Sequence, residues 1–151
     1  MVIERQDMTA VQYEKDFYAW AMWNAKALRE GNLSEVDVEH VAEEIESMGK
    51  SEKRELYNRL VVLLAHLLKW QFQPDCRGKS WRLTISEQRR QIQFLLKESP
   101  SLQASLEDAL QAAYPDSVRL ALLETGFIDS PFPAECPYGM NEVLEEDYLP
   151  E

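Results

Sequence analysis

Apolar residues recur every three or four positions along most of the chain, which is the spacing that places them on one face of an α-helix. Glycine and proline fall where this spacing breaks, as they do at helix ends. The pattern predicts helices over residues 11–30, 34–48, 51–72, 81–99, 102–113 and 116–126. No stretch alternates between apolar and polar residues as a strand does. We therefore predict an all-α fold, a compact bundle of five to six helices.

Several residues have predicted roles at the helix ends. Ser34, with Asp37 three positions on, approximates a capping box for the second helix, and Gly49 is predicted to end it. Pro115 is predicted to separate the fifth helix from the sixth. The third helix is apolar over most of its circumference between Leu60 and Leu68, which is typical of a buried central helix.

The pattern changes after Gly126. Pro131, Pro133 and Pro137 lie close together, so we expect an extended surface segment rather than a helix. The last residues, 141–151, can add one acidic turn. We predict that residues 1–151 form a single domain, with a core over about 11–126 and a proline-rich acidic tail, residues 127–151, packed on it.

Charge is distributed unevenly along the chain. Sixteen Lys and Arg against 27 Asp and Glu give a net charge of −11, which disfavours binding to nucleic acid or to an anionic membrane. Residues 51–100 differ from the rest, because they hold ten basic and five acidic residues. Residues 1–50 carry a net charge of −6, and residues 101–151 carry −10.

Aromatic residues alternate with cations in this basic region. The candidate binding residues are Lys69, Arg77, Lys79, Trp81 and Arg82. Such residues can contact an acidic or phosphorylated partner, or stack on single-stranded nucleic acid. The favoured structural interpretation is that the basic region pairs with the acidic segment 101–151 of the same chain. A helix N-terminus capped by Ser80, beside Lys79 and Arg82, is the one anion site that the pattern indicates.

Two further residues are candidates for catalysis. His66 lies among leucines, and Glu44 lies beside Val41 and Met48 at helical spacing. A histidine paired with a glutamate can act as general acid and base in a hydrolase or nuclease, with Lys69 and Arg82 holding phosphate. In the alternative interpretation, His66 has a single structural partner and Glu44 lies on a solvated helix face.

The sequence lacks the residue patterns of metal sites, phosphate-binding loops and disulfide frameworks. Asp37-x-x-His40 occurs once, whereas a carboxylate metal site in a helix bundle needs such a pair twice, so we predict no metal and no cofactor. Gly78-Lys79-Ser80 lacks the upstream glycine of a phosphate-binding loop. Cys76 and Cys136 have neither zinc-ligand spacing nor the pattern of a disulfide framework. Reduced thiols, the absence of a leader and the shortness of the longest apolar run, residues 60–65, predict a cytoplasmic protein without membrane contact.

Several blocks of the sequence resemble a known family. They include DFYAW at 16–20, AEEIESMG at 42–49, HLLKW at 66–70, SPSL at 99–102, ETG at 124–126 and CPY at 136–138. Together they resemble the domain-of-unknown-function twenty-nine family, known largely from cyanobacteria. The resemblance implies one compact helical domain of bacterial cytoplasmic type, and it implies no activity, cofactor or catalytic residue. The polar and aromatic positions within matching blocks are Glu43, Glu44, Glu46, His66, Lys69, Trp81 and Arg82.

Three functional hypotheses follow. The first is a non-enzymatic interaction or accessory module that engages an acidic or phosphorylated partner through the basic region. The second is the hydrolase or nuclease that uses Glu44 and His66. The third is self-association through the first helix, where Tyr13, Phe17, Tyr18, Trp20 and Trp23 exceed what one buried stripe can absorb. The sequence leaves the oligomeric state open.

Overall fold

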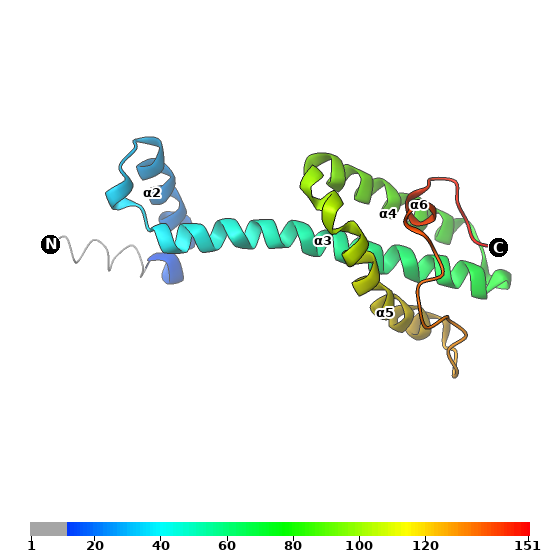
Figure 1. Ribbon diagram of the computed structural model, residues 1–151. Helices are drawn as coiled ribbons and strands as arrows, with labels where there is room; N and C mark the ends of the chain where they lie inside the picture. The colour runs from blue at the N-terminus through cyan, green and yellow to red at the C-terminus, as the bar shows by residue number, and fades with distance from the viewer. Residues whose placement is uncertain (1–11) are drawn as a thin grey trace. The chain divides into compact units, whose positions relative to one another are not determined.

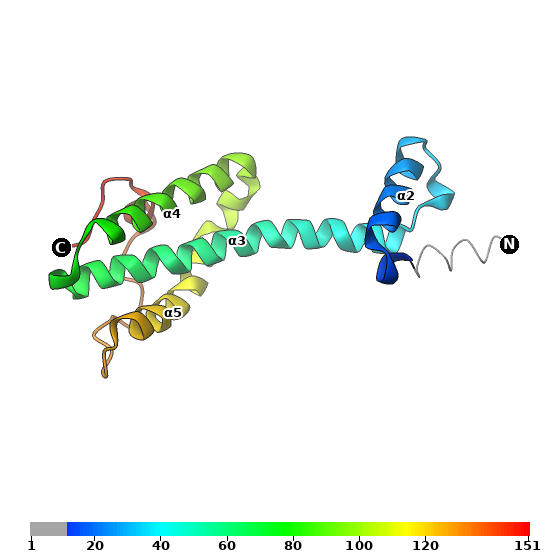
Figure 2. The same cartoon turned by 180° about the vertical axis from the view of Figure 1, so that it is seen from behind.

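The computed structural model describes residues 12–151, which form helices and no strands (Figures 1 and 2). The α-helices are α2 (Phe17–Arg29), α3 (Val38–Phe72), α4 (Lys79–Glu98), α5 (Leu106–Thr125) and α6 (Met140–Leu144). Short 3-10 helices lie between them: η1 (Leu33–Glu35), η2 (Pro74–Cys76) and η3 (Pro100–Ser105). The prediction of an all-α fold is confirmed for these residues.

The chain divides into two compact units, Met1–Ser51 and Glu52–Glu151. We call them the N-terminal unit and the C-terminal unit. The boundary falls within α3, so the first turns of this helix belong to one unit and the remaining turns to the other. The single domain over residues 1–151 stays a prediction.

The structure corrects the predicted break at Gly49. Helix α3 continues through this residue for 35 residues in all, and Gly49 is not among the glycines with positive φ. A glycine in a helix interior costs about 1 kcal/mol relative to alanine, which neighbouring helix-forming residues can offset. The predicted start at Ser34 is also wrong, because Ser34 lies in η1. Helix α3 begins after Asp37, whose carbonyl accepts a hydrogen bond from Val41 N at 2.9 Å.

Two other predicted helix limits are wrong. Helix α5 runs through Pro115, which was expected to end a helix. Pro115 has no amide hydrogen to donate to the carbonyl of Gln111, but both residues are exposed, so water can serve that carbonyl. The first predicted helix is interrupted at Asp16, whose side chain accepts from Ala19 N at 3.1 Å and caps α2. Val11 lies outside the described residues.

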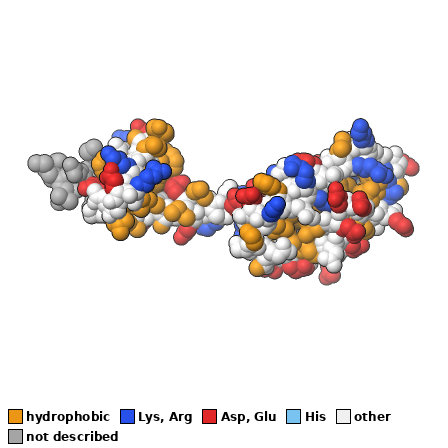
Figure 3. Space-filling model, turned by 90° about the horizontal axis from the view of Figure 1, so that it is seen from above, with side chains coloured by type: hydrophobic (Ala, Val, Ile, Leu, Met, Phe, Trp, Pro, Cys, Tyr) orange, Lys and Arg blue, Asp and Glu red, His pale blue; other side chains and the backbone are white. Residues whose placement is uncertain are grey.

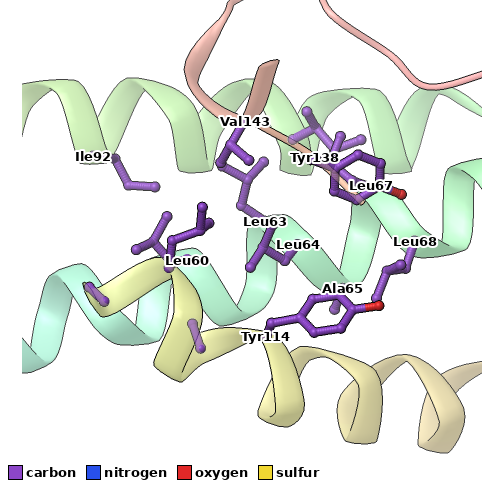
Figure 4. Close-up of a cluster of buried hydrophobic side chains, with 14 of the residues drawn as sticks. Leu60, Leu63, Leu64, Ala65, Leu67, Leu68, Ile92, Tyr114, Tyr138 and Val143 are labelled. Carbon is purple, nitrogen blue, oxygen red and sulfur yellow. The ribbon is translucent and has the colours of Figure 1, made fainter. Parts of the chain in front are cut away.

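The core of the C-terminal unit forms around the second half of α3 (Figure 4). Helices α4 and α5 lie on either side of this half in both views (Figures 1 and 2). The leucines of α3 that are completely buried are Leu56, Leu60, Leu63, Leu64, Leu67 and Leu68. Burying one such side chain stabilises the fold by about 1.5 to 3 kcal/mol. The prediction of a buried central helix between Leu60 and Leu68 is confirmed.

The tail, residues 127–151, contributes to the same core. Phe132, Tyr138 and Val143 are buried within it. The ring of Phe132 lies 5.4 Å from that of Phe72, and the hydroxyl of Tyr138 donates to Gln71 Oε1 at 2.8 Å. Aromatic side chains and Val143 therefore anchor the tail to the C-terminal unit.

Candidate functional site

The predicted anion site lies where α4 begins. Helix α4 starts at Lys79, and Gly78 occupies the N-cap position with extended backbone. No side chain caps this end, so the prediction that Ser80 is the cap is wrong. Glycine is accepted at an N-cap, although it has no side-chain oxygen to satisfy the first amides. The start of α4 therefore combines amides that lack a side-chain acceptor with the positive end of the helix dipole.

Two of the predicted binding residues are engaged inside the C-terminal unit. Lys69 is only 5% exposed, its ammonium group pairs with Glu124, and it lies 5.1 Å from the ring centre of Trp81. Arg77 donates from Nε to the carbonyl of Trp70 at 2.6 Å and from Nη2 to the carbonyl of Glu151 at 2.9 Å. Lys69 is thus paired and buried, and two of the five N–H donors of Arg77 are engaged within the unit.

Lys79 and Arg82 have a different environment. Both side chains are exposed, and within residues 12–151 neither has a hydrogen-bonding or ion-pair partner. The guanidinium of Arg82 lies 5.1 Å from the ring centre of Trp70, which leaves its N–H groups open to solvent. Trp81, between the two cations in sequence, is half-buried. We call Lys79, Trp81 and Arg82 the α4 start surface.

A groove between α4 and the tail continues from this surface. Its first part, of about 150 Å³, is lined by Arg82, Ile85, Ser86, Arg89, Glu146, Asp147 and Leu149. An adjoining part of about 260 Å³ is lined by Ser86, Arg89, Arg90, Gln93, Leu144 and Glu146. The groove carries charges of both signs, because Glu146 and Asp147 line it together with Arg82, Arg89 and Arg90.

Arg89 links α4 to the tail. It is 2% exposed and donates to the carbonyls of four tail residues, Glu142, Val143, Glu146 and Tyr148, over 2.8 to 3.2 Å. Burial lowers the pKa of its guanidinium, which nevertheless stays protonated because arginine titrates far above neutral pH. Sequence reasoning did not choose Arg89 as a site residue. Its spacing from Ile85 and Ile92, four and three positions, could have placed it on the buried face.

The basic region therefore meets the tail through backbone carbonyls. Among the described residues, one ion pair joins residues 51–100 to residues 101–151, that between Lys69 and Glu124. The expected pairing of the basic region with the acidic residues of 101–151 is found at Lys69 and Glu124, whereas residues 127–151 are held by the hydrogen bonds of Arg89. Carbonyl oxygens carry less charge than carboxylates, so this contact depends more on geometry and burial than on net charge.

The two catalytic candidates have separate partners. His66 Nδ1 donates to the carbonyl of Val62 at 2.8 Å, and burial lowers the pKa of the imidazole, helped by the charge of Lys69. Glu44 accepts from the hydroxyl of Tyr13. Glu44 belongs to the N-terminal unit and His66 to the C-terminal unit, and no hydrogen bond joins them. The structure does not bring them together as an acid–base pair.

A polar network in the N-terminal unit was not recognised from the sequence. Asp37 Oδ2 accepts from Trp20 Nε1 at 2.9 Å and contacts His40 Nδ1 at 2.8 Å. The ring of Tyr13 stacks on that of His40 with centroids 4.2 Å apart. The backbone amide of Asp37 donates to Asn24 Oδ1 at 2.7 Å. These contacts hold α2 against the first turns of α3.

Asp37 and the protonated form of His40 stabilise each other. Burial raises the pKa of Asp37, but hydrogen bonds from Trp20 and His40 outweigh it and leave the pKa below its ordinary value. The hydrogen bond to Asp37 raises the pKa of His40. Within residues 12–151, no third His, Cys, Asp or Glu joins a pair of this kind to form a metal site. The Asp37-x-x-His40 spacing thus produces a hydrogen-bonded pair at the start of α3, and the bond from Trp20 to Asp37 links this pair to α2.

Comparison with known proteins places the chain in a family. No curated protein and no solved structure matches it. In the part of the chain that the structure describes, no helix combines the length and the apolar composition that crossing a bilayer requires. The model of the family described as "Domain of unknown function DUF29" matches residues 12–149. The resemblance noted in the sequence is confirmed, and the chain belongs to this family.

Proposed function

We propose that this protein is a non-enzymatic interaction module that binds a short acidic or phosphorylated segment of a partner at the α4 start surface. One observation carries the proposal: Lys79 and Arg82 are exposed and have no ion-pair partner, although the protein has a large excess of carboxylates. Two such cations side by side at a helix start are electrostatically suited to an anion.

The chemistry of binding follows from the helix geometry. Residues three positions apart lie on the same face of a helix, so Lys79 and Arg82 can contact one anionic group together. The first amides of α4 point toward the same region, and charge-assisted hydrogen bonds to them are stronger than neutral ones. Trp81 offers an apolar surface for a neighbouring side chain of the partner.

The surrounding charges favour a short anionic segment over a long polyanion. Glu146 and Asp147 line the groove that leads away from Arg82. A nucleic acid strand that extended along this groove would meet these carboxylates, whereas a peptide with one phosphate or two acidic residues needs to contact only Lys79, Arg82 and the first amides of α4. The hydrolase alternative has weaker support, because Glu44 and His66 each have their own structural partner.

The test compares two double charge reversals on the same helix. Lys79→Glu with Arg82→Glu alters the α4 start surface, and Arg90→Glu with Lys97→Glu makes the same change in net charge further along α4. Binding of a fluorescent octapeptide that contains phosphoserine and glutamate is measured by anisotropy, beside its unphosphorylated and all-serine forms.

We expect the first double variant to weaken binding at least tenfold and the second to leave it within about twofold. Circular dichroism should show the same helix content for all three proteins. Failure of the wild type to bind either acidic peptide at millimolar concentration would overturn the proposal, as would equal losses in the two variants.

A further inference from the structure

Helix α2 has more apolar surface than its own unit covers. Its sequence, FYAWAMWNAKALR, is apolar on nearly every side, yet only Trp20, Asn24 and Ala27 are buried. A helix that is apolar all round is normally surrounded by protein. Within residues 12–51 those three are also the only buried side chains. Units of about 50 residues are marginal on their own, and oligomerisation is a common means of stabilising them.

Apolar side chains lie on the surface of this unit (Figure 3), and the large ones that are exposed are more numerous here than in the C-terminal unit. Of the large hydrophobic residues that are exposed among residues 12–151, nine belong to the N-terminal unit, and four belong to the larger C-terminal unit. The nine are Phe17, Tyr18, Met22, Trp23, Leu28, Leu33, Val38, Ile45 and Met48, each 44% to 75% exposed. At about 200 Å² for a large side chain, they present about 1,000 Å². A standard interface buries about 800 Å² on each partner.

The first turns of α3 carry an ordered part of this surface. Val38, Val41, Ile45 and Met48 follow one another at spacings of three, four and three residues, which places them in a single stripe along the helix. Val38, Ile45 and Met48 are exposed, and Val41 is half-buried. This is the spacing by which one helix packs against another in a coiled coil.

The spacing of the stripe reads the same in both directions. When a second copy of the helix lies antiparallel to the first, Val38 comes opposite Met48 of the copy and Val41 opposite Ile45. Every apolar residue then meets another apolar residue, as a two-fold symmetric interface requires. A parallel pair would also have apolar layers. In that arrangement the two α2 helices would lie at the same end of the paired helices, whereas in the antiparallel arrangement they lie at opposite ends.

The charges of α3 are compatible with this pairing. Glu39, Glu43 and Glu46 lie on the opposite side of the helix from the stripe, at 100° per residue. Glu44 is held by the hydroxyl of Tyr13, and Asp37 by Trp20 and His40. No carboxylate of these turns is therefore brought into the apolar layers of the pair.

We infer that the N-terminal unit is a self-association surface, in which two copies of the chain pair antiparallel through Val38, Val41, Ile45 and Met48 and the aromatic residues of α2 flank the pair. The occupant of the stripe is a second copy, because the palindromic spacing and the exposed area both match a symmetric dimer. This inference is independent of the binding proposed for the α4 start surface.

The first test measures the mass of the full chain by sedimentation over 1 to 200 µM. We expect a monomer–dimer equilibrium, and Ile45→Glu with Met48→Glu should raise the dissociation constant at least tenfold. The matched control is Leu123→Glu with Ile128→Glu, which changes two exposed apolar residues of the C-terminal unit and should leave the equilibrium unchanged. A wild type that stays monomeric, with the stripe free or covered by its own chain, would overturn the inference.

The second test fixes the direction of the pair without a disruptive change. In a chain with Cys76→Ser and Cys136→Ser, the Val38→Cys and Met48→Cys variants are oxidised separately and as a mixture. We expect covalent dimers in the mixture and not in either variant alone. Covalent dimers in either separate sample, or no covalent dimer in the mixture, would refute the antiparallel pairing. This test still reports on the pairing of two chains if the variant with Ile45→Glu and Met48→Glu loses helix content.

Discussion

The two units use the same helix in different ways. Nine residues of α3 between Leu56 and Trp70 are buried, whereas none from Val38 to Ser51 is. The buried half is apolar around its circumference and has α4, α5 and the tail around it. The first half keeps its apolar residues in one stripe with carboxylates opposite. Apolar spacing thus shows which face of a helix packs, but it does not show whether the packing partner belongs to the same chain.

The largest expected effect is on the free energy of unfolding, and it is tested by one alanine substitution in each half of α3. Leu64→Ala removes a completely buried side chain and should lower the free energy of unfolding by about 2 to 5 kcal/mol. Ile45→Ala removes one that is 63% exposed, and at low micromolar concentration its effect should stay within about 0.5 kcal/mol. Urea denaturation followed by circular dichroism measures both. Equal effects would mean that the first half of α3 has a buried environment in the free chain.

The next effect tests whether the tail is part of the C-terminal unit. Arg89→Met leaves four tail carbonyls without their donor and should cost about 2 to 4 kcal/mol. Arg90→Met, whose partner is the exposed Glu87, should cost about 0.5 kcal/mol or less. Limited proteolysis should cut the first variant within residues 127–151 faster than the wild type. Unchanged cleavage would show that the aromatic anchors hold the tail without Arg89.

The smallest effect contrasts the two histidines, one in each unit. The pKa of His40 is raised by its hydrogen bond to Asp37, and the pKa of His66 is lowered by burial. In an NMR titration of the imidazole protons, His40 should therefore titrate at higher pH than His66. Asp37→Asn should lower the pKa of His40 and leave that of His66 unchanged. The reverse order of titration would contradict both assigned environments.

These directions also define the pH range in which the network of the N-terminal unit is stabilising. The raised pKa of His40 gives stability that is present below the ordinary value of 6.5 and is lost as the pH rises through the raised value. The lowered pKa of Asp37 gives stability that is present above the ordinary value of 3.8 and is lost as the pH falls through the lowered value. The protection factors of the α2 amides, which correct the observed exchange rates for their intrinsic dependence on pH, should therefore be highest between pH 3.8 and pH 6.5.

The helices were predictable because their apolar periods are local. The predicted helix ends at Gly49 and Pro115 were wrong. Both residues are exposed, and a helix can continue through an exposed glycine or proline because water can hydrogen-bond the backbone groups there. Of the candidate binding residues, some are engaged within the chain and others are exposed, and the sequence could not separate the two groups. Lys69 finds Glu124, and Arg77 finds the carbonyls of Trp70 and Glu151, and the spacing of these pairs in the sequence gives no sign of contact.

The hydrogen bonds of Arg89 have a consequence for how the tail can change over evolution. Arg89 contacts backbone carbonyls, which every amino acid possesses, so docking of the tail places no demand on the side chains of Glu142, Glu146 or Tyr148 as acceptors. Mutation can therefore alter the charge that these residues present to solvent while the chain stays attached. In related chains with an arginine at this position, the side chains of the tail are free to diverge without the tail losing its place on the fold.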